Sequence, residues 1–228
     1  MHVRLSKSKI ATFEHCPKRL WLQAYRRELG ALDERTKYLF AAGHRLGELA
    51  RNAITGGLLV DTDPRKVDLA IDETRRLIAD GWSKAIFEAA FVRDDVVIRT
   101  DILQPDGWGG WQLTEVKNCT RVRDYVLRDV GTQLWVLRKQ PLCISSVSIR
   151  HVSRRVTMET DAARVTFIDE DVTDRIKELV AWRHSVVERA RAVLQGPEPQ
   201  RAVGSHCSFP FRCEFQAYCQ SGEDVAAK

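Results

Sequence analysis

Residues 96–117 read VVIRTDILQPDGWGGWQLTEVK, and this stretch decides the fold that the chain is expected to adopt. Two runs of strand-forming residues, 96–103 and 111–117, flank a turn rich in Gly and Pro, which predicts two antiparallel strands joined by a hairpin. Asp101 lies toward the end of the first run, and Glu115 and Lys117 lie at the end of the second. Because side chains alternate along a strand, Glu115 and Lys117 are expected on one face.

An acid, a hairpin and then Glu-x-Lys predict a site for a divalent metal ion. Mg²⁺ and Mn²⁺ prefer hard oxygen ligands, which the carboxylates of Asp101 and Glu115 can supply while leaving positions open for phosphate and water. Such a metal polarises a phosphoryl oxygen and lowers the pKa of a bound water. Lys117 would orient the attacking water or stabilise the developing charge. The alternative is that these side chains are solvated charges at strand ends.

The elements expected around this hairpin are helical before it and mixed after it. Helices are expected over 5–27, 36–53 and 63–81, then a short strand at 58–60 between the last two and a strand over 85–92 before the hairpin. A helix over 121–139, strands over 144–156 and 164–168, and a helix over 171–194 follow. Residues 195–199 read as a linker, and a cysteine-rich segment closes the chain.

Three further polar residues are candidates for the same site. His44 lies between Gly43 and Gly47, which thin that helix face so that a metal or another element could approach; a satisfied core histidine is the alternative. Gln133 falls on an apolar helix face, where a buried amide needs a partner, either the backbone or a ligand. Glu88, in the strand before Asp101, could face the same cleft.

The cysteines predict a second site. Cys207, Cys213 and Cys219 have the spacing C-x5-C-x5-C, and Cys16 is the natural donor of a fourth thiolate. Four thiolates suit a zinc ion or a 4Fe–4S cluster, and either would staple the two chain ends together. Free buried cysteines are the alternative. Cys119 and Cys143 fit no such pattern and are expected in the core.

Composition bounds the class of protein. The chain has 228 residues, 44% apolar and 29% charged, enough for one sizeable globular domain. No apolar run approaches the roughly 18 residues of a membrane span, and the start lacks the apolar core of a signal peptide, so a cytoplasmic protein is expected. The net charge of +5, mostly from Arg, suits phosphate partners, although a solvated basic surface gives the same count.

Together these residues resemble the RecB-like, iron–sulfur branch of the PD-(D/E)XK nuclease superfamily, which includes the CRISPR-associated RecB-like exonuclease and stand-alone bacterial relatives. The resemblance covers nearly the whole chain. It begins with the motif over 5–21 and continues through His44, Asp101, Glu115, Lys117, Gln133 and the C-terminal cysteine triplet. One departure is Leu137, which stands where the family commonly has tyrosine after the glutamine.

The resemblance implies an α/β fold, a restriction-endonuclease-like mixed β-sheet flanked by helices. It implies a single nuclease domain over 1–228, in which 1–27 and 196–221 form a small cysteine-cluster subdomain joining the N- and C-termini. The implied metal ligands for Mn²⁺ or Mg²⁺ are His44, Asp101, Glu115 and the carbonyl of Val116, with Asp101, Glu115, Lys117 and Gln133 as the catalytic set. Cys16, Cys207, Cys213 and Cys219 would hold a structural 4Fe–4S cluster, with Zn²⁺ as the alternative.

The implied activity is metal-dependent exonuclease cleavage of DNA, preferentially at single-stranded ends. It would serve DNA repair or CRISPR adaptation, with proteins of those pathways as partners and no membrane involvement. The missing tyrosine and the modest charge motivate an alternative: a weak or inactive nucleic-acid-binding module of the same fold.

Overall fold

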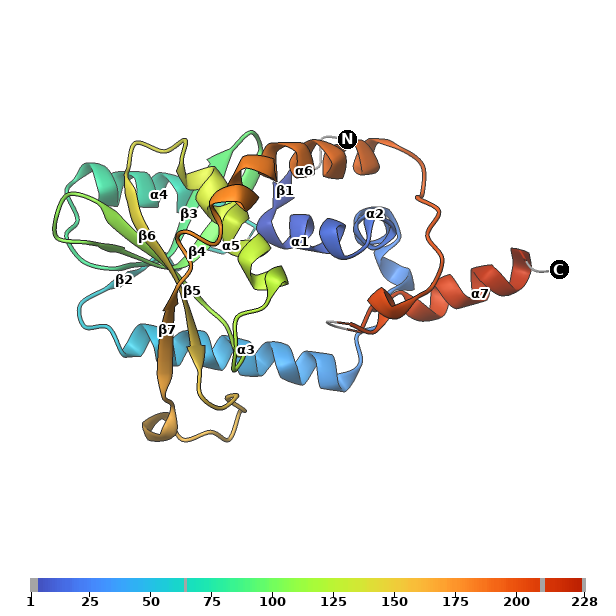
Figure 1. Ribbon diagram of the computed structural model, residues 1–228, viewed down its shortest axis with the longest axis horizontal. Helices are drawn as coiled ribbons and strands as arrows, with labels where there is room; N and C mark the ends of the chain where they lie inside the picture. The colour runs from blue at the N-terminus through green and yellow to red at the C-terminus, as the bar shows by residue number, and fades with distance from the viewer. Residues whose placement is uncertain (1–3, 64, 210–211, 227–228) are drawn as a thin grey trace. The chain divides into compact units, whose positions relative to one another are not determined.

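The computed structural model describes residues 4–63, 65–209 and 212–226, of which 222–226 are described by their backbone alone (Figure 1). The chain divides into two compact units, Met1–Leu39 with His184–Lys228, and Phe40–Arg183. The predicted subdomain of 1–27 and 196–221 falls inside the first unit, whose bounds are wider. The single nuclease domain over 1–228 stays a prediction.

The second unit is built on a mixed β-sheet with the strand order β2-β3-β4-β5-β6-β7. The strands are β2 (Leu58–Leu59), β3 (Ile86–Arg93), β4 (Val96–Pro105), β5 (Trp111–Val116), β6 (Ile144–Val152) and β7 (Phe167–Asp171). β2 with β3 and β5 with β6 are parallel pairs, whereas the other neighbours are antiparallel. The expected α/β class with a mixed sheet flanked by helices is therefore confirmed.

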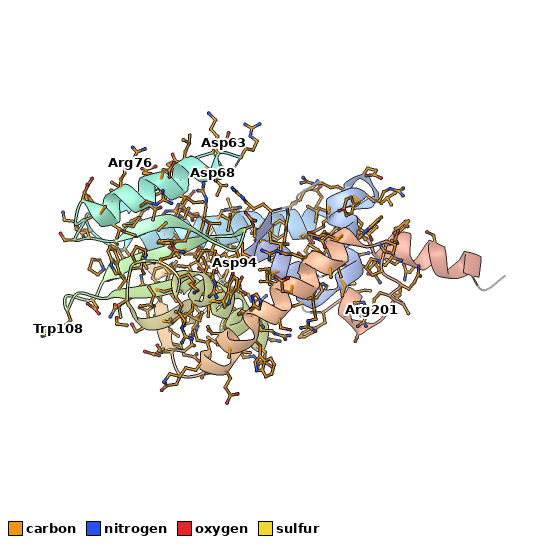
Figure 2. The ribbon with its side chains drawn as sticks, turned by 90° about the horizontal axis from the view of Figure 1, so that it is seen from above. Asp63, Asp68, Arg76, Asp94, Trp108 and Arg201 are labelled. Atoms are coloured by element: carbon orange, nitrogen blue, oxygen red, sulfur yellow. The ribbon has the colours of Figure 1, made fainter. Side chains whose placement is uncertain are left out.

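Two hairpins order the centre of this sheet. Asp94 and Asp95 have φ values of 46° and 55°, the left-handed conformation that a two-residue hairpin turn with the sheet's twist requires. In the second turn Gly107 and Gly109 have φ values of 83° and 93°, which glycine adopts without a steric penalty. Trp108 lies at its tip, where it projects into solvent and is 94% exposed (Figure 2).

Helices cover both faces of the sheet. Val116 packs with Leu46 and Leu49 of α3 (Glu34–Asn52), so the adjacent residues Glu115 and Lys117 point to the opposite face. That opposite face is covered by α5 (Asp124–Leu137), while α4 (Val67–Ala79) packs against β3 (Figure 1). The expected start of α4 at Pro64 lies outside the described residues.

The first unit is mostly helical. It contains β1 (Leu5–Ser6), α1 (Lys7–His15), α2 (Pro17–Tyr25), the C-terminal part of α6 (Lys177–Gln195), and α7 (Gln216–Ala226). The single helix predicted over 5–27 was wrong, because Cys16 is extended with φ −161° and ψ 118°. Pro17 disfavours the helical conformation of the residue before it, so α1 ends and α2 begins there. The helix α7 was not predicted.

Candidate functional site

The sheet register brings two acids of neighbouring strands together. Ile102 of β4 pairs with Thr114 of β5, so Asp101 and Glu115 occupy the next facing positions. Glu115 is only 1% exposed. The carboxylate of Asp101 accepts a hydrogen bond from the backbone N–H of Val116 at 2.6 Å, which ties the two strands at this point.

Lys117 lies between two carboxylates. Its Nζ is 2.6 Å from Oε1 of Glu115 and 2.7 Å from Oδ2 of Asp129, a residue of α5. Burial acts to lower the pKa of the Lys117 ammonium, but the charges of Asp129, Glu115 and Asp101 outweigh it and raise this pKa well above its usual value. Lys117 is therefore a cation at neutral pH rather than a base.

Gln133 completes the surroundings of Glu115. It is fully buried on α5, and its Nε2 donates to Oε2 of Glu115 at 2.7 Å. Both oxygens of the buried carboxylate thus receive a donor, one from Lys117 and one from Gln133. Among the described residues no hydrogen-bond partner is found for the amide oxygen Oε1 of Gln133. A buried acceptor of this kind is costly unless a water or ligand donates to it.

Glu88 occupies the position of β3 that faces Asp101, between the pairs Phe87–Ile102 and Ala89–Thr100. Its φ of 56° interrupts the ladder there. Its carboxylate lies 3.8 Å from the guanidinium of Arg51 on α3. Left-handed backbone at a non-glycine strand residue is strained, and such strain concentrates near functional sites. Arg51 of α3 is thus an ion-pair partner of Glu88, and the place of Glu88 in the cleft of Asp101 stays a prediction.

His44 is placed differently from the other predicted ligands. It is an exposed residue of α3, and within the described residues no hydrogen bond or ion pair is found for it. Likewise, no group of three or more His, Cys, Asp and Glu side chains in the described part of the chain is arranged to hold a metal ion. The roles of His44 and of the Val116 carbonyl as ligands stay predictions.

Asp101 and Glu115 suit Mg²⁺ or Mn²⁺ by their donor chemistry. Mg²⁺ is commonly held by one or two carboxylates, with waters and substrate phosphates completing its coordination. The two acids on facing strand positions offer that minimum, and Gln133, whose Nε2 contacts Glu115, has an amide oxygen without a hydrogen-bond partner among the described residues. These residues would hold the metal.

Asp129 was not predicted from the sequence, although one signal was available. Asp129 lies four residues before Gln133, so both project from the same face of α5 toward the sheet. An acid on the inner face of an apolar helix needs a buried partner, and Lys117 is that partner.

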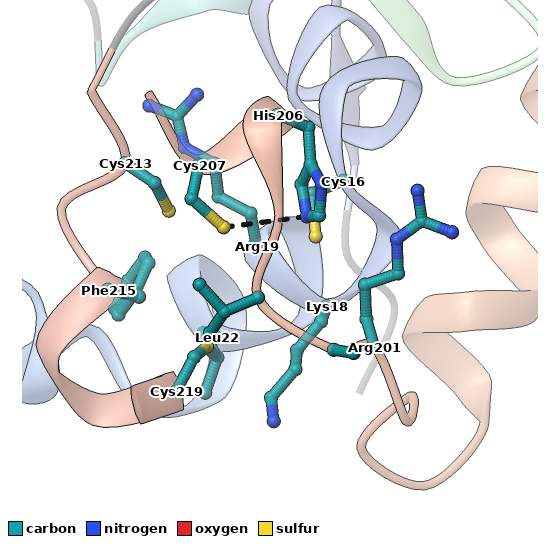
Figure 3. Close-up of a pocket in the computed structure, with 12 residues that line it drawn as sticks. Cys16, Lys18, Arg19, Leu22, Arg201, His206, Cys207, Cys213, Phe215 and Cys219 are labelled. Carbon is teal, nitrogen blue, oxygen red and sulfur yellow. Dashed lines mark hydrogen bonds between the residues drawn. The ribbon is translucent and has the colours of Figure 1, made fainter. Parts of the chain in front are cut away.

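The four predicted cysteines line one pocket of the first unit (Figure 3). Cys16, Cys207 and Cys213 are buried, Cys219 is half-buried, and all four are free thiols. Leu22 and Phe215 pack beside them, and burial raises the pKa of Cys213 to about 11. His206 also lines the pocket, with its Nε2 3.5 Å from Sγ of Cys207.

This donor set suits a soft metal. Four thiols from both ends of the chain meet at one pocket, and Lys18, Arg19 and Arg201 line it with positive charge that would stabilise thiolates. The described thiols are not arranged as a ready-made ligand group, so the cluster and the zinc alternative both stay predictions. Cys143, expected in the core, is exposed, whereas Cys119 is buried as expected.

Comparisons with known proteins do not assign a family. No family model matches the sequence, and no curated protein matches it. One solved structure, described as "Crystal structure of SSO0001", is 13% identical and covers 96% of this chain and 89% of that chain, with a TM-score of 0.45. A likeness at that TM-score carries no argument about fold or function.

Among the described residues, none of the helices combines the length and the apolar character that crossing a membrane requires.

Proposed function

We propose that this protein is a metal-dependent deoxyribonuclease of the PD-(D/E)XK kind that its sequence resembles. The observation that carries the proposal is the buried Glu115 carboxylate, held between Lys117 and Gln133 and facing Asp101 on the next strand. A buried carboxylate paired with a partly buried ammonium at the end of a strand is costly to maintain for stability alone. They are the groups that hydrolysis of a phosphodiester needs.

Asp101 and Glu115 would hold Mg²⁺ or Mn²⁺, which when bound polarises a phosphoryl oxygen and makes a bound water more acidic. Lys117, whose ammonium is paired with Glu115 and Asp129, would stabilise negative charge that develops on the phosphoryl oxygens. The unpartnered Oε1 of Gln133 can accept a hydrogen bond from a water and orient it.

Nucleic acid as the substrate is supported by a basic loop fixed beside Lys117. The side chain of Asn118 donates to the carbonyl of Val156 at 2.7 Å and accepts from the N–H of Val156 at 2.8 Å. This pair of hydrogen bonds fastens the loop between β6 and β7 to the residue that follows Lys117. The loop carries three exposed arginines, Arg154, Arg155 and Arg164.

The charge of this loop acts on a thiol that Lys117 also affects. Both Arg155 and Arg123, from the segment before α5, act on the thiol of Cys119 together with Lys117, and all three lower its pKa against the larger effect of burial. Positive charge beside a phosphate-cleaving site favours a polyanionic substrate and makes binding salt-dependent. DNA with single-stranded ends, in repair or CRISPR adaptation, is the substrate that the family resemblance favours.

Cleavage of end-labelled single- and double-stranded DNA by the purified full-length protein, metal by metal, tests the activity. With Mn²⁺ the wild-type protein is expected to shorten single-stranded DNA from an end. Glu115→Gln and Lys117→Ala are expected to reduce the rate at least ~100-fold, the scale of removing one group that stabilises transition-state charge. Asp124→Asn, an exposed acid at the start of α5, is the matched control and should cleave normally. Unchanged cleavage by both site variants would refute the assignment.

The basic loop is tested by DNA binding rather than by cleavage. Arg154→Glu with Arg155→Glu is expected to weaken binding of single-stranded DNA in Ca²⁺ and to flatten its salt dependence. The control pair Arg75→Glu with Arg76→Glu reverses two exposed arginines on α4 of the same unit and should have a much smaller effect. Equal effects of the two pairs would show that only net charge matters.

A second candidate function is a nucleic-acid-binding module without catalysis. It is favoured by the engagement of both Glu115 oxygens and by the absence, within the described residues, of a three-ligand group. Salt-dependent DNA binding with no cleavage under any divalent metal would support this alternative.

A further inference from the structure

Lys117 occupies an oxygen that a metal ion at this site would need. Its Nζ lies 2.6 Å from Oε1 of Glu115, while Oε2 of the same carboxylate accepts from Gln133. A divalent cation on Oε1 would compete with the ammonium, because two cations on one oxygen of a buried carboxylate repel each other. Binding of a cation at Glu115 therefore favours withdrawal of the ammonium toward another anion.

Asp129 is placed to receive it. Its Oδ2 is already 2.7 Å from Nζ of Lys117, and its side chain is 12% exposed. It projects from α5, which packs on this face of the sheet, so it can keep the ammonium without drawing on Asp101 or Glu115. Without Asp129 a displaced ammonium would be left partly buried and without its anion, which is unfavourable.

We propose that Asp129 is a positioning residue that holds the Lys117 ammonium when a divalent cation takes Glu115. The proposal rests on the proposed function, whose metal site it deepens. In this arrangement Lys117 shifts from a bridge between Glu115 and Asp129 to an ion pair with Asp129 alone. The ammonium then stays beside the cation, where it can act on a bound phosphate. Asp129 itself contacts neither metal nor substrate.

The buried amide of Gln133 gives separate support for a hydrated cation at Glu115. Its Oε1 has no hydrogen-bond partner among the described residues, although the side chain is fully buried and its Nε2 contacts Glu115. A bound water that donates to this oxygen would satisfy it. The structure therefore contains an acceptor that a hydrated cation at Glu115 would use.

The test is Mn²⁺ binding to the full-length protein without DNA, measured by electron paramagnetic resonance of free Mn²⁺ and by calorimetry. The site is identified as the Mn²⁺ that Glu115→Gln abolishes. Asp129→Asn is expected to weaken this binding by about tenfold, the effect of losing one hydrogen bond between charged groups. Asp129→Glu keeps the charge and should stay within about threefold of wild type by the same reasoning. Asp124→Asn, on the exposed side of the same helix, should bind as wild type.

A double-mutant cycle with Lys117→Met separates positioning from direct ligation. With no ammonium to place, Asp129→Asn is expected to change Mn²⁺ affinity by no more than about twofold, and Lys117→Met alone should bind at least as tightly as wild type. A full loss in the Lys117→Met background would show that Asp129 acts on the cation itself and would overturn the proposal. If Asp129→Asn does not weaken Mn²⁺ binding in wild type or in Lys117→Met, the proposal is overturned as well.

The outcomes for the proposed function are distinct. Glu115-dependent Mn²⁺ binding with the expected cycle but no DNA cleavage would remove the nuclease assignment and keep the role of Asp129. DNA cleavage together with additive effects of the Asp129 and Lys117 substitutions on Mn²⁺ affinity would keep the nuclease assignment and remove the role of Asp129. Absence of a Glu115-dependent Mn²⁺ site would overturn both.

Discussion

Glu115 differs from an ordinary surface glutamate because its carboxylate is buried. The side chain is 1% exposed, and its two oxygens are satisfied by an ammonium and an amide from two different elements. A buried charge persists only when it is paired and hydrogen-bonded. Glu-x-Lys placed Glu115 and Lys117 on one strand face, and the apolar pattern of α5 placed Gln133 inward. Asp129 was not predicted, because an acid on a helix is ordinary until the fold gives it a buried partner.

Gln133→Met tests the support of Glu115 with little change in side-chain volume. Removal of the Nε2 donor leaves Oε2 of Glu115 without that hydrogen bond, which should lower the free energy of unfolding by about 1–3 kcal/mol. Urea denaturation measures the loss. The control is Gln140→Met, whose amide bonds the backbone carbonyl of Val92 away from the acids. A Gln133→Met protein as stable as wild type would show that Lys117 alone suffices to satisfy Glu115.

At the scale of the elements, short turns fix how the neighbouring strands of the sheet pair. In the turn between β4 and β5 the carboxylate of Asp106 accepts from the N–H groups of Trp108 and Gly110 at 2.7 and 2.9 Å. Both hairpins followed from the sequence, since turn residues act locally. The division of the first predicted helix at Cys16–Pro17 was also a local signal, and the helix pattern across it masked that signal.

The turn at Asp106 should respond to acid. The N–H of Trp108, with further hydrogen bonds from Ser145 and Gly110, holds the pKa of the Asp106 carboxyl below its ordinary value. Its contribution to turn stability is therefore complete above the ordinary pKa and is lost as pH falls through the lowered value. The backbone amide resonance of Trp108 should shift with a midpoint below that of an unperturbed aspartate. Asp106→Asn keeps the acceptor without the charge and should abolish this titration; a titration that persists would assign it to another group.

Gly57, just before β2, lies so close to a core side chain that a larger residue would not fit. A Cβ on Gly57 would lie 2.4 Å from the ring of Phe87, which is buried in the core and 5% exposed. Gly57→Ala should destabilise the protein by about 1–3 kcal/mol through overpacking. Gly43→Ala, in α3 with open space around its Cβ, should be stabilising by up to about 1 kcal/mol. Urea midpoints that move in the same direction for both would contradict the packing argument.

Over the whole chain, the cysteine pocket joins residues that are far apart in sequence. Cys16 and the triplet Cys207, Cys213 and Cys219 line it within the unit that contains both chain ends. If a metal bound there, it would link the two ends of a small unit and stabilise it. The spacing of the triplet predicted a shared site, and the fold supplies the pocket and the neighbouring His206.

Metal content tests this pocket. Protein purified without oxygen is expected to be brown, with absorbance at about 400 nm and iron with sulfide. Cys213→Ala and Cys16→Ser should lose this content and melt at a lower temperature, whereas Cys143→Ser, an exposed cysteine outside the set, should retain it. Colourless protein with stoichiometric zinc would support the zinc alternative instead. Wild-type protein that contains neither metal would support the alternative that the four cysteines are free thiols.

The alternating pattern of 96–117, its turn residues and the helical periodicities were enough to predict the α/β class, both hairpins and the elements that carry His44, Asp101, Glu115 and Gln133. These features follow from the sequence because they depend on neighbours a few positions apart. Three others depend on contacts between distant segments: Asp129 against Lys117, Arg51 against Glu88, and Asn118 against Val156. Only the tertiary structure could decide them, because the partner of a buried charge or amide is fixed by which elements pack together.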